Sequence, residues 1–159
     1  MTRRVRLQLL GGTKSSQALR LWVNLWPPFL GAGIRVKRTA RSMKPVDVEM
    51  KLYFRNANHV GTHFGGSLFA MTDAFYMLML MASLGRDYMM WDKAATLRCR
   101  RPGRGTVRAE FGLSPNQIDD IREKLQTSPK YQPVFSVEVK DETEVVTAEV
   151  EWLLHVRKK

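Results

Sequence analysis

The 159-residue chain contains a single cysteine, Cys99, and no acidic residue before Asp47. One thiol cannot form an intrachain disulfide or a metal site built from cysteines, so both kinds of stabilised fold are excluded. The longest apolar run, residues 74–84, is shorter than the roughly 20 residues that cross a bilayer. We therefore expect no membrane insertion, and the lone thiol is typical of a reducing compartment such as the cytoplasm.

Charge is unevenly distributed along the sequence. Ten of the 26 basic residues precede Asp47, whereas the other 16 are nearly balanced by all 15 acidic residues. This predicts a basic segment at 1–14 and one domain at 15–159, rather than a uniformly basic nucleic-acid-binding surface. Few aromatic residues interleave with the basic ones, so we expect no nucleic acid partner. An arginine-rich start without acids also resembles an organellar transit peptide.

Hydrophobic periodicity predicts alternating helices and strands. Apolar residues at helical spacing predict a helix over 15–30, with Pro27-Pro28 disrupting its last turn. Residues 66–84 are apolar and poor in β-branched side chains, which favours one buried helix. A third, short helix should begin at the Ser114–Gln117 capping box. We expect a strand at 34–41, and clean alternation predicts further strands at 46–54, 94–100, 106–113 and two near the C-terminus.

These elements predict an antiparallel sheet with one covered face. A single sheet that curls around the 66–84 helix satisfies both the alternating strands and the apolar helix. Residues 101–105, with Pro followed by Gly, suggest a type II turn that joins 94–100 and 106–113 in a hairpin. Open sheet edges would favour pairing with another subunit.

Gly65-Gly66 opens the predicted buried helix. Two glycines allow a ligand to approach the backbone, and the N–H groups of a first helical turn lack intrahelical partners. Together with the helix dipole, those donors would stabilise a carbonyl oxygen that develops negative charge. The alternative is that the glycines only allow tight packing.

Asp73 is the only charged residue between His63 and Arg86. A carboxylate in such an apolar helix is costly unless it is paired or useful. It would suit a general base or a nucleophile with a raised pKa. The alternative is a structural carboxylate bonded to neighbouring hydroxyl groups.

Other polar residues carry weaker signals. His59 and His63 have metal-ligand spacing but no third ligand, so we expect no metal, and His63 fits a polar group lining a pocket. Arginines around 98–104 would either hold phosphates or form a solvated face. The methionines of the helix, Met77 among them, are either core or the wall of an acyl pocket.

Residues 58–73, NHVGTHFGGSLFAMTD, resemble the central motif of hotdog-fold acyl-CoA thioesterases. The resemblance is strongest to the phenylacetic-acid-pathway type and to an uncharacterised branch, DUF4442. In the thioesterases an asparagine lies seven residues before the glycine pair, and an acid follows the second glycine by seven. Asn58, Gly65-Gly66 and Asp73 match all three positions. The resemblance covers about residues 15–157 and implies an α+β hotdog fold, an antiparallel curved sheet wrapped around one long central helix, with an extra N-terminal helix.

The resemblance also implies a mechanism at a dimer interface, where one subunit binds the thioester carbonyl and the other supplies the acid. By this analogy the Gly66 and Ser67 N–H groups polarise the carbonyl, Asp73 activates water or attacks directly, and Asn58 positions water or the thioester. The partners would be an acyl-CoA-like molecule and a second copy of the chain, with dimers pairing further. Coenzyme A would enter only as part of the substrate. The remaining candidate residues are His63 for catalysis and Gly65, Thr62, Met77, Arg100 and Arg101 for substrate binding.

Phe64 departs from the thioesterase pattern, which commonly has histidine directly before the glycine pair. Here His63 lies one residue earlier, which favours an alternative, a non-catalytic hotdog domain that binds acyl-CoA or a similar ligand. A hydratase on this fold would need an acid–base pair, and both loop histidines precede Asp73. Nucleic-acid binding through residues 1–46 would weaken steeply with salt. The three-position match favours the thioesterase.

Overall fold

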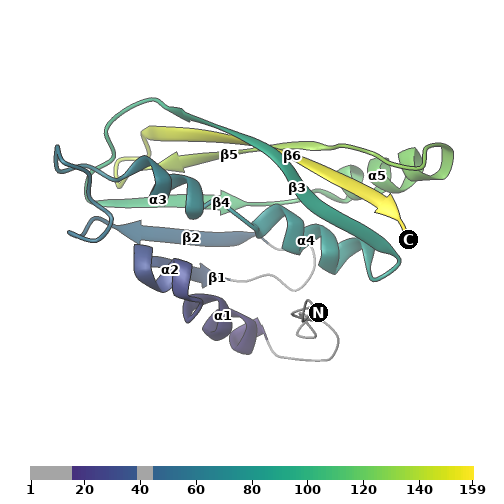
Figure 1. The fold of residues 1–159 in the computed structure, drawn as a ribbon, viewed down its shortest axis with the longest axis horizontal. Helices are drawn as coiled ribbons and strands as arrows, with labels where there is room; N and C mark the ends of the chain where they lie inside the picture. The colour runs from purple at the N-terminus through teal and green to yellow at the C-terminus, as the bar shows by residue number, and fades with distance from the viewer. Residues whose placement is uncertain (1–15, 39–44) are drawn as a thin grey trace, which may run out of the picture.

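The computed structural model describes residues 16–38 and 45–159 (Figure 1). The predicted basic segment 1–14 and residues 39–41 of the predicted first strand lie outside the described residues. The elements follow in the order α1 Ser16–Asn24, α2 Pro27–Ala32, β1 Ile34–Arg38, β2 Val46–Lys51, α3 Gly65–Ala70, α4 Phe75–Leu84, β3 Tyr88–Cys99, β4 Thr106–Phe111, α5 Pro115–Thr127, β5 Val134–Lys140 and β6 Val146–Lys158.

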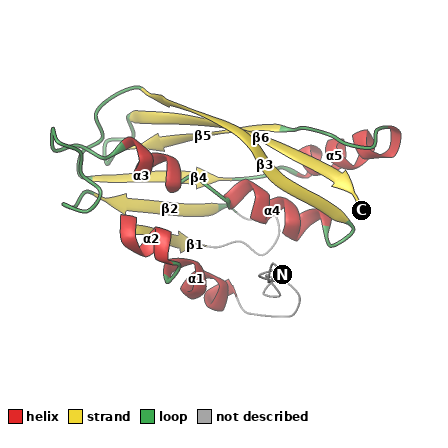
Figure 2. Cartoon of the chain, in the orientation of Figure 1, coloured by secondary structure: helices red, strands yellow, loops and turns green. Residues whose placement is uncertain are grey.

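All six strands belong to one antiparallel sheet in the order β1-β2-β4-β5-β6-β3. Figure 2 shows this sheet curving around α3 and α4. Alternate residues of each inner strand are buried against the helices, as Val46, Val48 and Met50 are in β2. This period of two places the core on one face of the sheet and charged side chains on the other, which confirms the predicted architecture.

The predicted hairpin between residues 94–100 and 106–113 is wrong. β3 pairs with β6 over a long ladder, from Tyr88 opposite Lys158 to Cys99 opposite Ala148, whereas β4 lies between β2 and β5. The 101–105 link therefore crosses from one part of the sheet to another. Carbonyl groups of the link accept hydrogen bonds from residues far away in the sequence. Leu52 N–H, for example, donates to the Gly105 oxygen at 2.8 Å. A Pro-Gly pattern indicates that the chain turns, but not which strands pair.

The predicted helix over 15–30 is two helices, α1 and α2. Trp26 is extended between them, with φ −65° and ψ 126°, and Pro27 and Pro28 occupy the first turn of α2. Proline suits that position because its ring fixes a helical φ and the N–H it lacks would have no partner there. The prolines thus begin a helix instead of disrupting one.

The predicted central helix also has a break, at residues 71–74. Ala74 has a left-handed backbone with φ +71°, which ends α3 before α4 begins at Phe75. By length and composition alone, the stretch Gly65–Leu84 is apolar enough to cross a membrane, with a mean hydropathy of 1.5. Half of it is buried inside this fold, where the sheet wraps it. The stretch therefore supplies the core of the domain.

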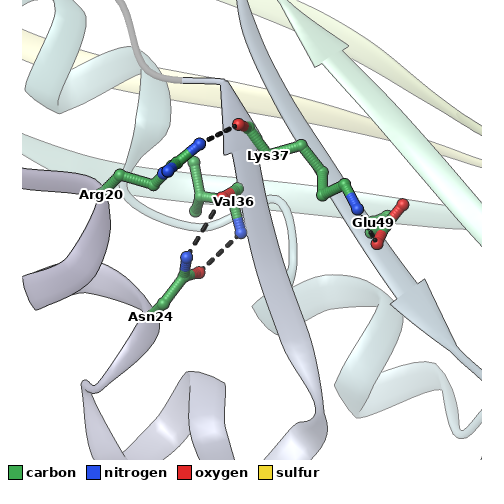
Figure 3. A network of polar contacts seen from close by, with 5 residues as sticks. All are labelled: Arg20, Asn24, Val36, Lys37 and Glu49. Atoms are coloured by element: carbon green, nitrogen blue, oxygen red, sulfur yellow. Dashed lines mark hydrogen bonds and ion pairs between the residues drawn. The ribbon is translucent and has the colours of Figure 1, made fainter. Parts of the chain in front are cut away.

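The two edges of the sheet differ in how they are covered. α1 lies along β1, where the Asn24 amide donates to the Val36 oxygen at 3.1 Å and accepts from Val36 N–H at 2.7 Å (Figure 3). Arg20 donates to the Lys37 oxygen at 3.0 Å. These contacts satisfy backbone groups that an edge strand would otherwise expose. β3, twelve residues long, forms the opposite edge.

Candidate functional site

The start of α3 presents two free backbone donors. Phe64 is extended and precedes Gly65, and its carbonyl oxygen accepts from Ser67 N–H at 2.9 Å and from Leu68 N–H at 3.1 Å. Among the described residues, Gly65 and Gly66 N–H have no recorded acceptor. The Ser67 N–H, expected to polarise a carbonyl, is thus used by the turn itself. The available donor pair is Gly65 and Gly66.

The Phe64 ring lies against Gly66. A Cβ added at Gly66 would approach the ring atoms Cδ1 and Cζ to 3.1 Å and Cε1 more closely still. A Cβ at Gly65 would instead meet Leu97 of β3 at an ordinary 4.0 Å. Phe64 is 55% exposed, so its ring forms an open wall beside the free donors. The close approach of the Phe64 ring to the backbone at position 66 therefore requires glycine there, whereas position 65 has no such contact.

Asp73 lies in the break between α3 and α4. It is half-buried, and burial raises the pKa of its carboxyl group, opposed by a hydrogen bond from Ala74 N–H. Left-handed backbone at a residue other than glycine costs about 1–3 kcal/mol and is concentrated at functional sites. The strained turn at Ala74 takes Asp73 out of the helical ladder.

The neighbouring hydroxyl groups proposed as structural partners of Asp73 bind elsewhere. Thr72 Oγ1 donates to the Phe69 oxygen at 2.8 Å and accepts from Trp152 Nε1 at 3.4 Å. Tyr76 donates to the Ser136 oxygen at 2.7 Å, and burial raises its pKa to about 12. Neither hydroxyl group is bonded to the Asp73 carboxylate in the described structure, which favours the chemical interpretation of this residue.

Asp92 of β3 is a second carboxyl group that the sequence analysis missed. It lies opposite Leu154, which is fully buried, so it belongs to the face of the sheet turned toward the helices. Burial raises its pKa, and repulsion from the Asp73 carboxylate raises it further. The signal in the sequence is an acid within the segment 91–93. That signal becomes clear only once the strand and its inner face are known.

Asn58 organises the loop that precedes the glycine pair. Its Oδ1 accepts from Val60 N–H at 3.1 Å and from Thr62 N–H at 3.0 Å. Its Nδ2 donates to the buried Thr62 Oγ1 at 2.8 Å. Side-chain bonds of this kind hold the backbone in a turn. Asn58 and Thr62 therefore act on the glycine pair through the loop that leads to it.

His63 is buried beneath the 101–105 link, with 3% of its surface exposed. Its Nε2 lies 3.1 Å from the Gly105 oxygen, so Nε2 carries the proton, because only a donor suits a carbonyl. Nδ1 is buried without a partner among the described residues. Burial lowers the pKa of the ring, which favours neutral imidazole. The structure gives this predicted catalytic residue a role in supporting the link.

Arg100 belongs to the outer face of the sheet, the face turned away from the helices. Its Nη2 lies 2.7 Å from Glu149 Oε2. Glu149 lines an outer groove of about 1130 Å³ to which all six strands contribute charged residues. Gly65, by contrast, lies beside Leu97 on the inner face. Within one chain, the structure thus separates Arg100 from the glycine pair, and Arg101 is exposed on the link.

Two further points concern ligands and the acyl wall. Met77 of α4 is partly buried and packs against the core, which is compatible with either of its predicted roles. The described residues contain no group of three or more His, Cys, Asp or Glu side chains arranged to hold a metal ion. The functional groups available here are the backbone donors of Gly65 and Gly66 and the carboxyl groups of Asp73 and Asp92.

Solved structures share this arrangement of one curved antiparallel sheet around a central helix. A protein of unknown function from Pseudomonas aeruginosa, described as a probable thioesterase, matches 92% of this chain and 97% of its own, with TM-score 0.79 and 23% identity. A thioesterase from Haemophilus influenzae matches 92% and 93%, with TM-score 0.67 and 14% identity. A protein of unknown function from Chlorobaculum tepidum matches 91% and 94%, with TM-score 0.71 and 13% identity. At these identities the matches show the fold, and the fold is the hotdog fold.

Residues 15–156 match the family described as a domain of unknown function, DUF4442, and the chain belongs to that family. This match confirms the family resemblance predicted from residues 58–73. A comparison with curated proteins gives no match. The family description names no reaction, so an activity must be argued from the site itself.

Proposed function

We propose that the protein is an acyl-CoA thioesterase that works as a homodimer. The observation that carries the proposal is that the chain has two free N–H donors, at Gly65 and Gly66, and a half-buried Asp73 carboxyl group of raised pKa. In the proposed dimer, one subunit supplies the donors and the other supplies the carboxyl group. Preorganised backbone donors stabilise the oxyanion of acyl transfer, and a carboxyl group with a raised pKa is a better base near neutral pH. The hotdog fold shared with proteins described as thioesterases adds support.

In the proposed reaction, a water oxygen attacks the thioester carbonyl carbon while Asp73 accepts a proton from that water. The Gly65 and Gly66 N–H groups stabilise the negative charge on the carbonyl oxygen. The intermediate then breaks its C–S bond, and the sulfur leaves and takes up the proton. The products are a carboxylic acid and coenzyme A, and no further cofactor is required. Met77 would line the acyl chain, and Arg101 would meet coenzyme A phosphates.

The homodimer is proposed to form through β3. α1 bonds to the backbone of Val36 and Lys37 on β1, so β3 is the edge that we propose for pairing. Trp91 and Met89 on β3 are 41% and 39% exposed, and Trp91 stacks on His155 with ring centroids 4.0 Å apart. Unpaired edge strands with exposed apolar side chains favour strand addition. The outer groove offers a second contact through which dimers would pair.

The alternative function is binding of acyl-CoA or a similar ligand without hydrolysis. Two observations favour it, the Phe64 ring beside the donors and the fixation of His63 beneath the 101–105 link. In this case no side chain at the site would need to transfer a proton. Asp73 would then be dispensable for ligand affinity. The cytoplasmic location and the absence of metal stay predictions under either function.

The test is thiol release from short-chain, long-chain and aromatic acyl-CoAs by the purified protein. Asp73→Asn keeps the shape of the side chain and removes the base, so turnover should fall about 100-fold or more. Asp87→Asn, an exposed acid on the turn before β3, is the matched control and should retain turnover. Light scattering should give a mass of at least twice 18.3 kDa. A folded dimer that binds acyl-CoA without turnover would support the alternative.

A further inference from the structure

α1 carries its polar and apolar faces in the reverse of the usual orientation. Its polar side chains Arg20 and Asn24 point to the sheet and bind the backbone of β1 (Figure 3). Its apolar side chains Leu21 and Trp22 point to solvent, and Val23 is buried. A helix of a soluble domain normally buries its apolar stripe. The exposed apolar side chains of α1 therefore need an explanation outside the packing of the chain.

Five exposed apolar side chains follow one another along α1, the turn after it and α2, and together they are called the α1–α2 face. Leu21 and Trp22 belong to α1, Leu25 and Trp26 to the turn that joins α1 to α2, and Leu30 to α2. Each of these side chains is between 38% and 67% exposed. Two of the chain's four tryptophans belong to this surface. The members of the α1–α2 face are Leu21, Trp22, Leu25, Trp26 and Leu30.

The charged side chains that α1 and β1 contribute beside the α1–α2 face are all basic. Arg20, Arg35, Lys37 and Arg38 are its described charged neighbours in α1 and β1, and neither element contains an acid. Glu49 and Asp47 of β2 pair with Lys37 and Arg38. Arg35 has no acidic partner among the described residues. The sequence adds six more basic residues, and no acid, in 1–15 and 39–44.

We propose that the α1–α2 face docks the protein on the surface of an anionic lipid bilayer, without spanning it. Leucine and tryptophan on one side with arginine and lysine around them are the composition of helices that lie in the headgroup region. Apolar side chains enter the boundary of the acyl chains while basic side chains meet the negative surface. The proposal concerns a surface separate from Gly65 and Asp73, so it stands whether or not the protein is a thioesterase.

Charge selects this occupant over two others. A second copy would bring the same acid-free residues 16–38, whose four charged side chains are all basic, against this surface, and like charges repel. A nucleic acid would match the charge, but phosphate contacts require no leucine–tryptophan surface. An anionic bilayer matches both the charge and the apolar side chains.

The test is co-sedimentation of the full-length protein with vesicles of phosphatidylcholine alone or with about 30% phosphatidylglycerol. We expect binding to the anionic vesicles at least tenfold stronger than to the neutral ones, and weakening between about 0.1 and 0.5 M salt. Leu21→Gln with Leu25→Gln should weaken binding about tenfold or more. Phe54→Gln, which changes an 89% exposed side chain outside α1 and α2, is the control and should leave binding intact.

Arg35→Gln tests the electrostatic part and should weaken anionic binding about fivefold. Thermal unfolding of each variant checks that the protein remains folded. Equal loss with Phe54→Gln, or no binding to anionic vesicles, would overturn the proposal. The proposal would also be overturned if the protein self-associated with rising concentration and the Leu21→Gln, Leu25→Gln variant lost that association. A second copy of the chain would then be the occupant of the α1–α2 face. A third outcome is that the protein binds duplex DNA in a salt-sensitive way and does not bind vesicles. If the leucine changes left that DNA binding intact, the basic side chains would serve nucleic-acid binding instead.

Discussion

The contact between Phe64 and Gly66 yields a prediction that the structure makes quantitative. In Gly66→Ala, the new Cβ would come within 3.1 Å of two ring atoms and closer to a third, so the Phe64 ring must rotate. Rotating an exposed side chain away from its preferred torsion costs about 0.5–1.5 kcal/mol. Alanine in a helix gains up to about 1 kcal/mol over glycine. We therefore expect Gly66→Ala to change the free energy of unfolding by less than about 1 kcal/mol.

A double-mutant cycle with Phe64→Ala separates two contributions to the free energy of unfolding. One is the cost of rotating the Phe64 ring, and the other is the higher helix propensity of alanine. Removing the ring should make Gly66→Ala more favourable by about 0.5–1.5 kcal/mol, the energy of the lost clash. Gly65→Ala is the matched control, because its Cβ would meet Leu97 at 4.0 Å and not the ring. Its coupling with Phe64→Ala should be near zero. Urea unfolding measures all the variants, and equal coupling at both glycines would refute the argument.

Three further predictions concern the break in the central helix and the loop before it. Ala74→Gly should be neutral or stabilising and Ala74→Val destabilising by about 1–2 kcal/mol in thermal unfolding, since φ +71° suits glycine alone. The raised folded-state pKa values of Asp73 and Asp92 mean that stability falls as pH rises from the unfolded pKa through the folded one. Either Asp→Asn change should therefore stabilise the protein at pH 7 and not at about pH 3 in urea unfolding; an equal effect at both pH values would contradict the assigned burial cost. Asn58→Ala removes four side-chain hydrogen bonds, the longest of them 3.5 Å, and should cost about 2–4 kcal/mol by the same measurement. A loss below about 0.5 kcal/mol would show that the loop keeps its conformation without the Asn58 side chain.

Much of the candidate site was predictable because its signals are local. Asp73 was conspicuous as a carboxyl group alone in an apolar segment, and Gly65-Gly66 as a helix start. Asp92 was not predictable, because its relation to Asp73 depends on the strand β3 lying beside the helices. The free N–H groups at the start of α3 were also not predictable. They depend on a single turn, in which the Phe64 carbonyl oxygen accepts hydrogen bonds from Ser67 and Leu68 N–H.

The sequence by itself determined the elements whose signals lie within a few residues of one another. The Ser114–Gln117 capping box is observed, with Gln117 N–H donating to Ser114 Oγ at 3.2 Å, and the alternating strands bury the expected faces. Only the tertiary structure decided that β3 pairs with β6, that the central helix breaks at residues 71–74, and that Leu21 and Trp22 of α1 face outward. Those outcomes depend on the free energy of contacts between residues far apart in the chain. Local propensity and periodicity carry no information about such partners.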